Sequence, residues 1–134
     1  MFGKIAHIGI AVNDLDKSID LLSRMFGTKP NQRERVDDQQ VNSAMFSFGN
    51  ISVELLESTA PGSSIAKFIE KRGEGMHHLS FVVDDITAEL ARLRKAGFQL
   101  IDEQPRKGAD NCLVAFLHPK STNGVLIEIS QKLE

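Results

Sequence analysis

Two histidines and two glutamates recur at corresponding places in the two halves of the chain: His7 and Glu54, then His78 and Glu128. The segment H-I-G-I-A-V-N-D-L, which starts at His7, aligns with H-L-S-F-V-V-D-D-I, which starts at His78, at an offset of 71 residues. Further along, I-S-V-E-L aligns with V-L-I-E-I, with three additional residues in the second loop. Imidazole and carboxylate groups bind divalent metal ions and transfer protons. The repeat therefore predicts one site to which both halves contribute.

The apolar neighbours of these four residues indicate where their side chains point. Successive side chains of a β-strand face opposite sides of a sheet, so residues next to a His or Glu face away from it. These neighbours are apolar in all four segments: Ile8 beside His7, Leu79 beside His78, Val53 and Leu55 beside Glu54, and Ile127 and Ile129 beside Glu128. If the apolar set packs against helices, the four polar side chains converge on the inner face of a curved sheet.

A metal ion explains why two carboxylates should be placed together on an inner face. Without a cation, neighbouring buried carboxylates repel each other or take up protons. Two imidazoles and two carboxylates, completed by water, suit one divalent Co, Mn, Ni, Fe or Zn ion, and the absence of cysteine ligands argues against a closed structural zinc site. Open water positions are what a catalytic Lewis acid needs. We therefore predict one divalent ion per chain, held by His7, Glu54, His78 and Glu128.

Each of these residues also has an ordinary structural explanation. His7 alone could be a core or strand-end histidine, and Glu54 alone could be a solvated strand residue; the recurrence of both in two copies favours the metal site. Other polar residues nearby are not predicted to be ligands. His77 is interpreted as a structural neighbour of the site, His118 as a loop residue and Glu57 as a surface residue.

The periodicity of apolar residues predicts the elements that position the site. Residues 4–12 and 77–83 read as strands that end at helix-capping pairs, Asn13-Asp14 and Asp84-Asp85. The helices that follow end at Gly27 and Gly97. Two hairpins are predicted, 41–48 with 50–57 and 112–118 with 124–131, and further strands near 30–37 and 98–103.

Together these elements predict an α+β protein of two tandem βαβββ modules. The modules form a curved eight-stranded mixed sheet around the metal site, with the helices on the outer face. Module 1 covers about residues 4–58, a linker with one short helix covers 59–74, and module 2 covers about 75–132, within a single domain of residues 1–134. The sequence leaves open whether the modules pair within one chain or between chains.

Composition excludes several classes of protein. The 16 Lys and Arg residues are interspersed with 18 Asp and Glu residues, so no basic surface for nucleic acid is indicated. A single cysteine, Cys112, excludes an intrachain disulfide, and the N-terminal residues contain no long apolar segment. We expect a cytoplasmic protein with no nucleic-acid or membrane partner.

Three stretches resemble the methylmalonyl-CoA epimerases of the vicinal oxygen chelate (glyoxalase/bleomycin resistance/dioxygenase) superfamily. The first is shared widely across the superfamily, and the other two are similar to the epimerases in particular. The resemblance covers nearly the whole chain and is most specific in these stretches. They are H-I-G-I-A-V-N-D-L at 7–15, S-S-I-A-K-F-I-E-K-R-G-E-G-M-H-H-L-S-F at 63–81, and V-A-F-L-H-P-K-S-T-N-G-V-L-I-E-I at 114–129.

The resemblance implies the reaction and the roles of several residues. The family's metal ligands fall on the four residues found from the repeat, and its reaction interconverts the C2 epimers of methylmalonyl-CoA through a metal-stabilised enolate. That reaction needs an acid/base group on each side of C2. Glu128 is the candidate for one catalytic group. A second carboxylate proposed in some members falls on Ser43 here, so that role has no assigned residue.

The resemblance also implies an acyl-CoA substrate and a homodimer. Lys120, Lys71 and Arg72 are candidates to bind the phosphates of coenzyme A. Two alternatives remain, a glyoxalase I type of isomerase and a metal-free binding protein. The first would require glutathione-binding features that do not appear here, and members of the second kind usually lose ligands, whereas this chain keeps all four.

Overall fold

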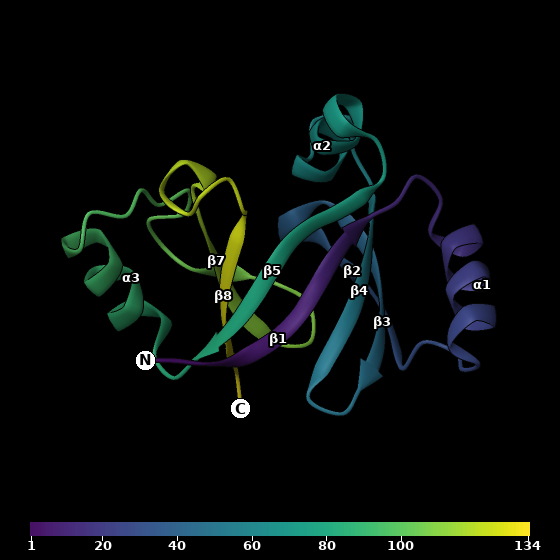
Figure 1. Cartoon of the computed structure of the whole chain (residues 1–134), viewed down its shortest axis with the longest axis horizontal. Helices are drawn as coiled ribbons and strands as arrows, with labels where there is room; N and C mark the ends of the chain where they lie inside the picture. Colours follow the sequence, from purple (N-terminus) through teal and green to yellow (C-terminus); the bar gives the residue numbers. More distant parts are fainter.

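The computed structural model describes residues 1–134 and contains one eight-stranded mixed sheet with three α-helices (Figure 1). The strands follow one another across the sheet in the order β2-β3-β4-β1-β5-β8-β7-β6, and the sheet is strongly curved. The predicted fold class is therefore confirmed. The elements are β1 Phe2–Ala11, α1 Leu15–Phe26, β2 Gln32–Val36, η1 Asp37–Gln39, β3 Val41–Phe48, β4 Ile51–Ser58, α2 Ser64–Arg72, β5 Gly75–Val83, α3 Ile86–Lys95, β6 Arg106–Lys107, β7 Cys112–Leu117, η2 Pro119–Ser121 and β8 Ile127–Lys132.

The two halves of the chain join at the centre of the sheet. Strands β1 and β5, one from each half, pair antiparallel, and they are the two strands that run across the middle of Figure 1. Outward from this pair, β4 pairs parallel with β1, and β8 pairs parallel with β5. The same connectivity is thus used twice, and the modules pair within one chain, which the sequence had left open.

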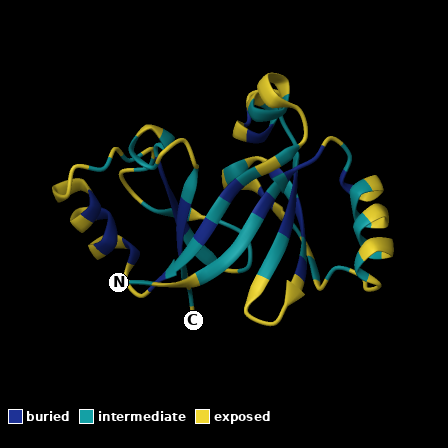
Figure 2. Cartoon of the chain, in the orientation of Figure 1, coloured by how far each residue is buried: buried dark blue, intermediate teal, exposed yellow.

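Each half packs its helix against the outer face of its own strands, as the alternation of side chains predicts. In the first half, Leu15 of α1 packs with Phe46 and Leu55, and the helix begins at the capping residue Asp14 and ends at Gly27, whose φ is 73°. In the second half, Ile86 and Leu90 of α3 pack with Ile129. Figure 2 shows the buried side of α3 facing the sheet and its far side exposed. The strand residues beside Glu54 and Glu128 are therefore anchored by helices.

Helix α2 has a different position, because it belongs to the linker and not to either repeat. Its residue Ile65 packs with Ala11, Val41 and Leu56, which lie on the face that also carries the His and Glu side chains. In Figure 1 the helix sits at the upper end of the sheet, above β1 and β5. α2 therefore closes one end of the concave face, while α1 and α3 cover the outside.

The predicted strand at 98–103 is wrong, whereas the strand near 30–37 is confirmed as β2. Leu100 makes only an isolated bridge to Leu117, and the edge strand is β6, residues 106–107. The apolar residues Phe98 and Leu100 pack against the core under α3. This packing, and not pairing with a neighbouring strand, explains why the segment is apolar. Strand β8 also begins later than expected, because Thr122 closes a turn by donating a hydrogen bond to the Val125 carbonyl.

Gly9 gives a test of how tightly the central strands must approach. Gly9 lies opposite His78, and a Cβ on Gly9 would lie 2.2 Å from Cε1 of the His78 ring. We predict that Gly9→Ala displaces His78 and destabilises the protein by about 1–3 kcal/mol, as overpacking does. Denaturant unfolding measures the change. Gly3→Ala on the same strand is the control, because its Cβ would meet only the Val82 carbonyl at 3.4 Å; equal effects of the two substitutions would contradict the prediction.

Candidate metal centre

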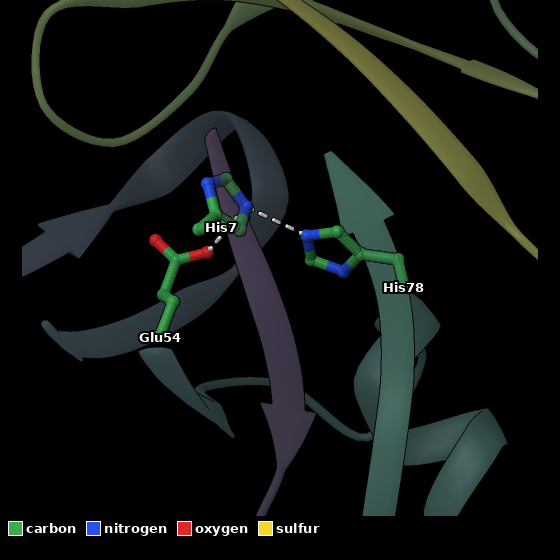
Figure 3. A group of neighbouring side chains, drawn as sticks. All are labelled: His7, Glu54 and His78. Atoms are coloured by element: carbon green, nitrogen blue, oxygen red, sulfur yellow. Dashed lines mark hydrogen bonds and ion pairs between the residues drawn. The ribbon is translucent and has the colours of Figure 1, made fainter. Parts of the chain in front are cut away.

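The four residues found from the repeat lie on the four central strands of the sheet. Glu54 is on β4, His7 on β1, His78 on β5 and Glu128 on β8, and these strands are consecutive neighbours. Figure 3 shows the side chains of His7, Glu54 and His78 pointing toward one another from three adjacent strands. The pairing of Glu54 and His78 with Gly9, one on each side of β1, brings them to the same level of the sheet.

The ligand atoms gather around Nε2 of His7. This nitrogen lies 2.9 Å from Nε2 of His78, 3.3 Å from Oε1 of Glu54 and 3.2 Å from Oε1 of Glu128. Oε1 of Glu128 also lies 3.7 Å from Nε2 of His78. The structure therefore brings the four predicted residues together. The ligand atoms of His7, Glu54 and His78 all lie within 4.8 Å of one another, and Glu128 lies beside the two histidines.

Burial makes the charges in this cluster costly. Glu54, His78 and Glu128 are at most 5% exposed, and Oε1 of Glu128 accepts no hydrogen bond. Burial raises the pKa of Glu54 to about 7, helped by the Glu128 charge and opposed by His7. Burial also opposes ionisation of Glu128, but the neighbouring His78 and His7 outweigh it and lower its pKa. One carboxylate is thus readily ionised and the other resists ionisation.

The two histidines differ in the same way. Burial would lower the pKa of His7, but the close contact with Glu128 and the charges of Glu54 and Glu128 outweigh it and raise that pKa to about 8. The pKa of His78 falls to about 3, chiefly because of burial. Since the two Nε2 atoms face each other at 2.9 Å, a proton or a metal ion must lie between their lone pairs.

The spacing of these atoms fits a divalent metal ion. Nitrogen and oxygen ligands bind such ions at about 2.0–2.2 Å, so two ligands at right angles are about 3 Å apart. The separations of 2.9, 3.2 and 3.3 Å around His7 match this value. An ion would also neutralise the two buried carboxylates and give Oε1 of Glu128 a partner. The donor set, its spacing and its charge therefore all suit one divalent cation.

His77 supports the ring of His78 and is not itself in the cluster. Its Nδ1 lies 2.9 Å from Nδ1 of His78, and its ring contacts those of Phe68 and Phe116 edge to face. A hydrogen bond at Nδ1 leaves Nε2 of His78 free to face the other ligands. The interpretation of His77 as a structural neighbour agrees with this contact.

The other polar residues near the site have structural roles. His118 accepts a hydrogen bond from the backbone of Lys120 and caps the turn η2. Glu57 accepts the backbone N–H of Leu15 at 2.9 Å, at the start of α1, so it is not simply a surface residue. Ser43 is buried on β3, opposite Glu34, and its hydroxyl donates a long hydrogen bond of 3.4 Å to the Glu34 carbonyl. No carboxylate stands at that position.

Two cavities adjoin the four-residue cluster. The smaller, about 90 Å³, is mainly apolar and is lined by His78, Phe116, Leu126 and Ile65 of α2, together with Arg106. The larger, about 350 Å³, has mostly polar residues in its lining, among them His7, Glu54, Glu128, Lys4, Asp110 and Lys132. A ligand could thus reach the cluster with an apolar part in one cavity and polar groups in the other.

The sequence analysis did not identify three of the residues that line these cavities. Gln39 lies in both cavities, Arg106 in the smaller and Asp110 in the larger. All three were detectable, because the offset of 71 residues that pairs His7 with His78 also pairs Gln39 with Asp110 and Arg35 with Arg106.

The three cations predicted to bind coenzyme A phosphates lie away from the cluster. Lys71 and Arg72 are exposed in the last turn of α2, with the Arg72 guanidinium 5.9 Å from the centre of the Phe68 ring. Lys120 is exposed in the turn η2. Residues of α2 and Leu126, which follows this turn, line the smaller cavity, so the three cations stand on elements next to this cavity without lining it. None of the three helices is long and apolar enough to cross a membrane.

Comparison with known proteins identifies the family. Residues 6–116 match the sequence model of the glyoxalase/bleomycin resistance protein/dioxygenase superfamily. An ethylmalonyl-CoA/methylmalonyl-CoA epimerase of Cereibacter sphaeroides is 35% identical over 98% of this chain and 99% of its own. A variant of the Streptomyces coelicolor methylmalonyl-CoA epimerase, in complex with 2-nitronate-propionyl-CoA, superimposes with a TM-score of 0.95 at 33% identity over the full length of both chains. A methylmalonyl-CoA epimerase in complex with methylmalonyl-CoA and NH4+ superimposes with a TM-score of 0.91 at 34% identity, over 98% of this chain and 96% of the other.

The chain therefore belongs to the glyoxalase/bleomycin resistance protein/dioxygenase superfamily. Within that superfamily it is a member of the methylmalonyl-CoA epimerase family, which consists of isomerases. The resemblance inferred from the three sequence stretches is confirmed.

Glu54 allows a test of the metal centre in which stability and metal affinity change in opposite directions. Its pKa in the folded protein, about 7, lies above the ordinary 4.5, so ionisation of Glu54 opposes folding as the pH rises through this range. In the presence of a chelator, Glu54→Gln should therefore stabilise the protein, increasingly from pH 5 to pH 8, by up to about 3 kcal/mol at about 1.4 kcal/mol per pKa unit. Thermal and denaturant unfolding across this pH range measure the gain.

The same variant should lose affinity for the metal. We expect wild-type protein to bind about one Co²⁺ per chain, and Co²⁺ at 100 times its Kd to stabilise it by about 2.7 kcal/mol. Glu54→Gln should need at least about tenfold more Co²⁺ for the same effect. Glu103→Gln, at an exposed carboxylate, is the control. A melting temperature of the wild type that does not respond to Co²⁺, Mn²⁺, Ni²⁺ or Zn²⁺ would rule out the metal centre.

Proposed function

We propose that this protein is a metal-dependent epimerase that interconverts the two C2 epimers of methylmalonyl-CoA. The observation that carries the proposal is the full-length superposition, with a TM-score of 0.95, on a methylmalonyl-CoA epimerase in complex with an acyl-CoA analogue. The cluster of four potential ligands between two cavities supports it, because such a site can hold an anionic substrate against a cation.

The role of the metal is to stabilise charge. A divalent ion held by His7, Glu54, His78 and Glu128 supplies positive charge for the negative charge that develops on the substrate when the C2 proton leaves. We assign the role of proton acceptor to Glu128. Its neighbours His78 and His7 keep this buried carboxylate in the ionised form, which is the form that can accept a proton.

The remaining parts of acyl-CoA are assigned by their chemistry. The smaller cavity, with Phe116, Leu126 and Ile65, suits the apolar stretch of the pantetheine arm next to His78. Lys71 and Arg72 on α2 and Lys120 on the turn η2 stand on elements next to this cavity, and we assign to these rim cations the binding of the coenzyme A phosphates. The substrate would then span from these cations to the cluster.

A second substrate is favoured by one relative. The Cereibacter sphaeroides protein, which is 35% identical over almost the whole of both chains, is an ethylmalonyl-CoA/methylmalonyl-CoA epimerase. Ethylmalonyl-CoA differs by one methylene group, which in an apolar pocket changes binding by about 1–3 kcal/mol. Activity on both substrates is consistent with the proposed reaction, and their ratio of kcat/KM measures the preference.

Proton exchange at C2 is the direct test of the reaction. In deuterated water, wild-type protein with Co²⁺ should convert each epimer of methylmalonyl-CoA into the other and introduce deuterium at C2, as followed by mass spectrometry and chiral analysis. Glu128→Gln should lower both rates by at least about 100-fold, because proton transfer by a positioned group contributes about 10²–10⁴-fold.

The controls separate this reaction from its main rival. Glu103→Gln, which alters an exposed carboxylate paired with Arg94, should have wild-type rates. If no deuterium entered C2 and the protein isomerised the glutathione hemithioacetal of methylglyoxal, the protein would be a glyoxalase I type of enzyme and not an epimerase.

The rim cations can be tested with a shortened substrate. The double variant Lys71→Ala/Lys120→Ala should raise KM for methylmalonyl-CoA about tenfold with little change in kcat, because it removes binding that is the same in the ground and transition states. For methylmalonyl-pantetheine, which lacks the phosphates, wild type and variant should have the same KM. Lys95→Ala, an exposed residue at the end of α3, is the control. Equal effects on both substrates would exclude a phosphate contact.

A further inference from the structure

Asp110 brings a third carboxylate to the larger cavity. This cavity is lined by His7, Glu54 and Glu128 of the cluster and by Asp110 from the loop between β6 and β7. Asp110 is not among the predicted ligands, and its side chain is 46% exposed. It therefore faces the space next to the cluster without belonging to it.

The internal repeat pairs Asp110 with Gln39. Both residues stand two positions before a strand, β3 or β7, and both precede a residue with left-handed backbone, Gln40 with φ 55° or Asn111 with φ 52°. Gln39 also lines the larger cavity. The repeat thus places one residue of each module beside the cluster in the same way that it places the histidines and glutamates, but only Asp110 can ionise.

The loop that carries Asp110 has a left-handed backbone. Asp110 and Asn111 both have positive φ, 56° and 52°, a region that Asp and Asn tolerate better than other residues with side chains. Contacts on two sides hold this turn. The Asp110 N–H donates to Oε1 of Glu34 at 2.9 Å, and the Lys132 ammonium lies 2.9 Å from the Asp110 carboxylate. The left-handed turn and its contacts with Glu34 and Lys132 therefore set the position of the Asp110 side chain.

Ser43 explains how this loop reaches the first module. Ser43 and Glu34 are direct partners across β2 and β3, so their side chains share one face of the sheet. The small, buried Ser43 leaves the Glu34 carboxylate free to accept the Asp110 N–H. A carboxylate at position 43 would repel Glu34 and compete for that space. The missing carboxylate on β3 and the presence of Asp110 in the cavity are thus two parts of one arrangement.

We propose that Asp110 is the second proton carrier of the epimerisation, acting on the face of C2 opposite to Glu128. The proposal rests on the proposed function. In one direction the Asp110 carboxylate takes the C2 proton as the C2–H bond breaks, and the carrier on the other face, a role that the proposed function gives to Glu128, returns one proton to C2. In the reverse direction the two groups exchange roles. One proton is removed and one is added, so the substrate keeps its composition and inverts at C2. Lys132 pairs with the carboxylate form of Asp110.

The two-carrier arrangement makes a stereochemical prediction for Asp110→Asn. With one carrier lost, epimerisation should fall at least about 100-fold, whereas the epimer whose C2 proton faces Glu128 should still exchange this proton for solvent deuterium with retention of configuration. The other epimer should not exchange. Asparagine tolerates left-handed backbone, so the loop should keep its conformation. The measurements are deuterium content at C2 for each pure epimer, the rate of epimerisation, and Co²⁺ affinity, which should stay within about threefold of wild type.

Two further variants make the outcome unambiguous. Asp110→Glu keeps a carboxylate and should restore part of the epimerisation and the exchange of both epimers. Asp20→Asn, on the exposed side of α1, should match the wild type. Epimerisation by Asp110→Asn within threefold of wild type would overturn the proposal, and so would loss of exchange from both epimers with Co²⁺ affinity intact, because that result would give Asp110 a role in binding only. Absence of exchange in the wild type would instead refute the proposed function.

Discussion

The antiparallel pairing of β1 with β5 is the constraint on which the site depends. It is the only strand pairing between the two modules, and it brings Nε2 of His7 to 2.9 Å from Nε2 of His78. The approach is possible because residue 9 has no side chain, and the ring of His78 fills the space that a Cβ would take. The parallel strands β4 and β8 then add one glutamate on each side of this pair. A change that shifts β1 relative to β5 therefore alters all four residues at once.

The buried charged groups of the site make folding less favourable. Two carboxylates and two imidazoles are buried around one point, and Oε1 of Glu128 has no hydrogen bond. Replacing such buried charged groups by well-packed apolar residues is often neutral or stabilising. The hydrophobic clusters under α1 and α3 supply the stability that tolerates this arrangement, because they fix the outer faces of the strands that carry the four residues. The division of each strand into an apolar outer face and a polar inner face is thus both the folding pattern and the origin of the site.

The sequence predicted the features that follow from alternation and repetition. The strands, the helices with caps at Asp14 and Asp85, and the convergence of the four residues all depend on local patterns that occur twice. Prediction from the sequence was wrong where tertiary contacts, and not local patterns, determine the structure. The segment with Phe98 and Leu100 is apolar like a strand, but it packs under α3, and the short strand β6 has only two residues. Loop 108–111 carries no periodic signal, because its conformation is set by Glu34 and Lys132, which lie far away in the chain.

The repeat also clarifies what symmetry can and cannot supply in such a site. Two equal modules give two equal half-sites, which suits a cation that needs balanced ligands from both sides. Inversion at a carbon atom, however, needs a proton carrier on each of two faces of a single substrate, and the substrate itself is not symmetric. The modules differ in this respect: Gln39 and Asp110 occupy corresponding positions, but one is a neutral amide and the other a carboxylate beside Lys132. Divergence at positions next to the ligands, with the ligands themselves kept in both copies, is how a duplicated fold can combine a symmetric metal centre with asymmetric chemistry.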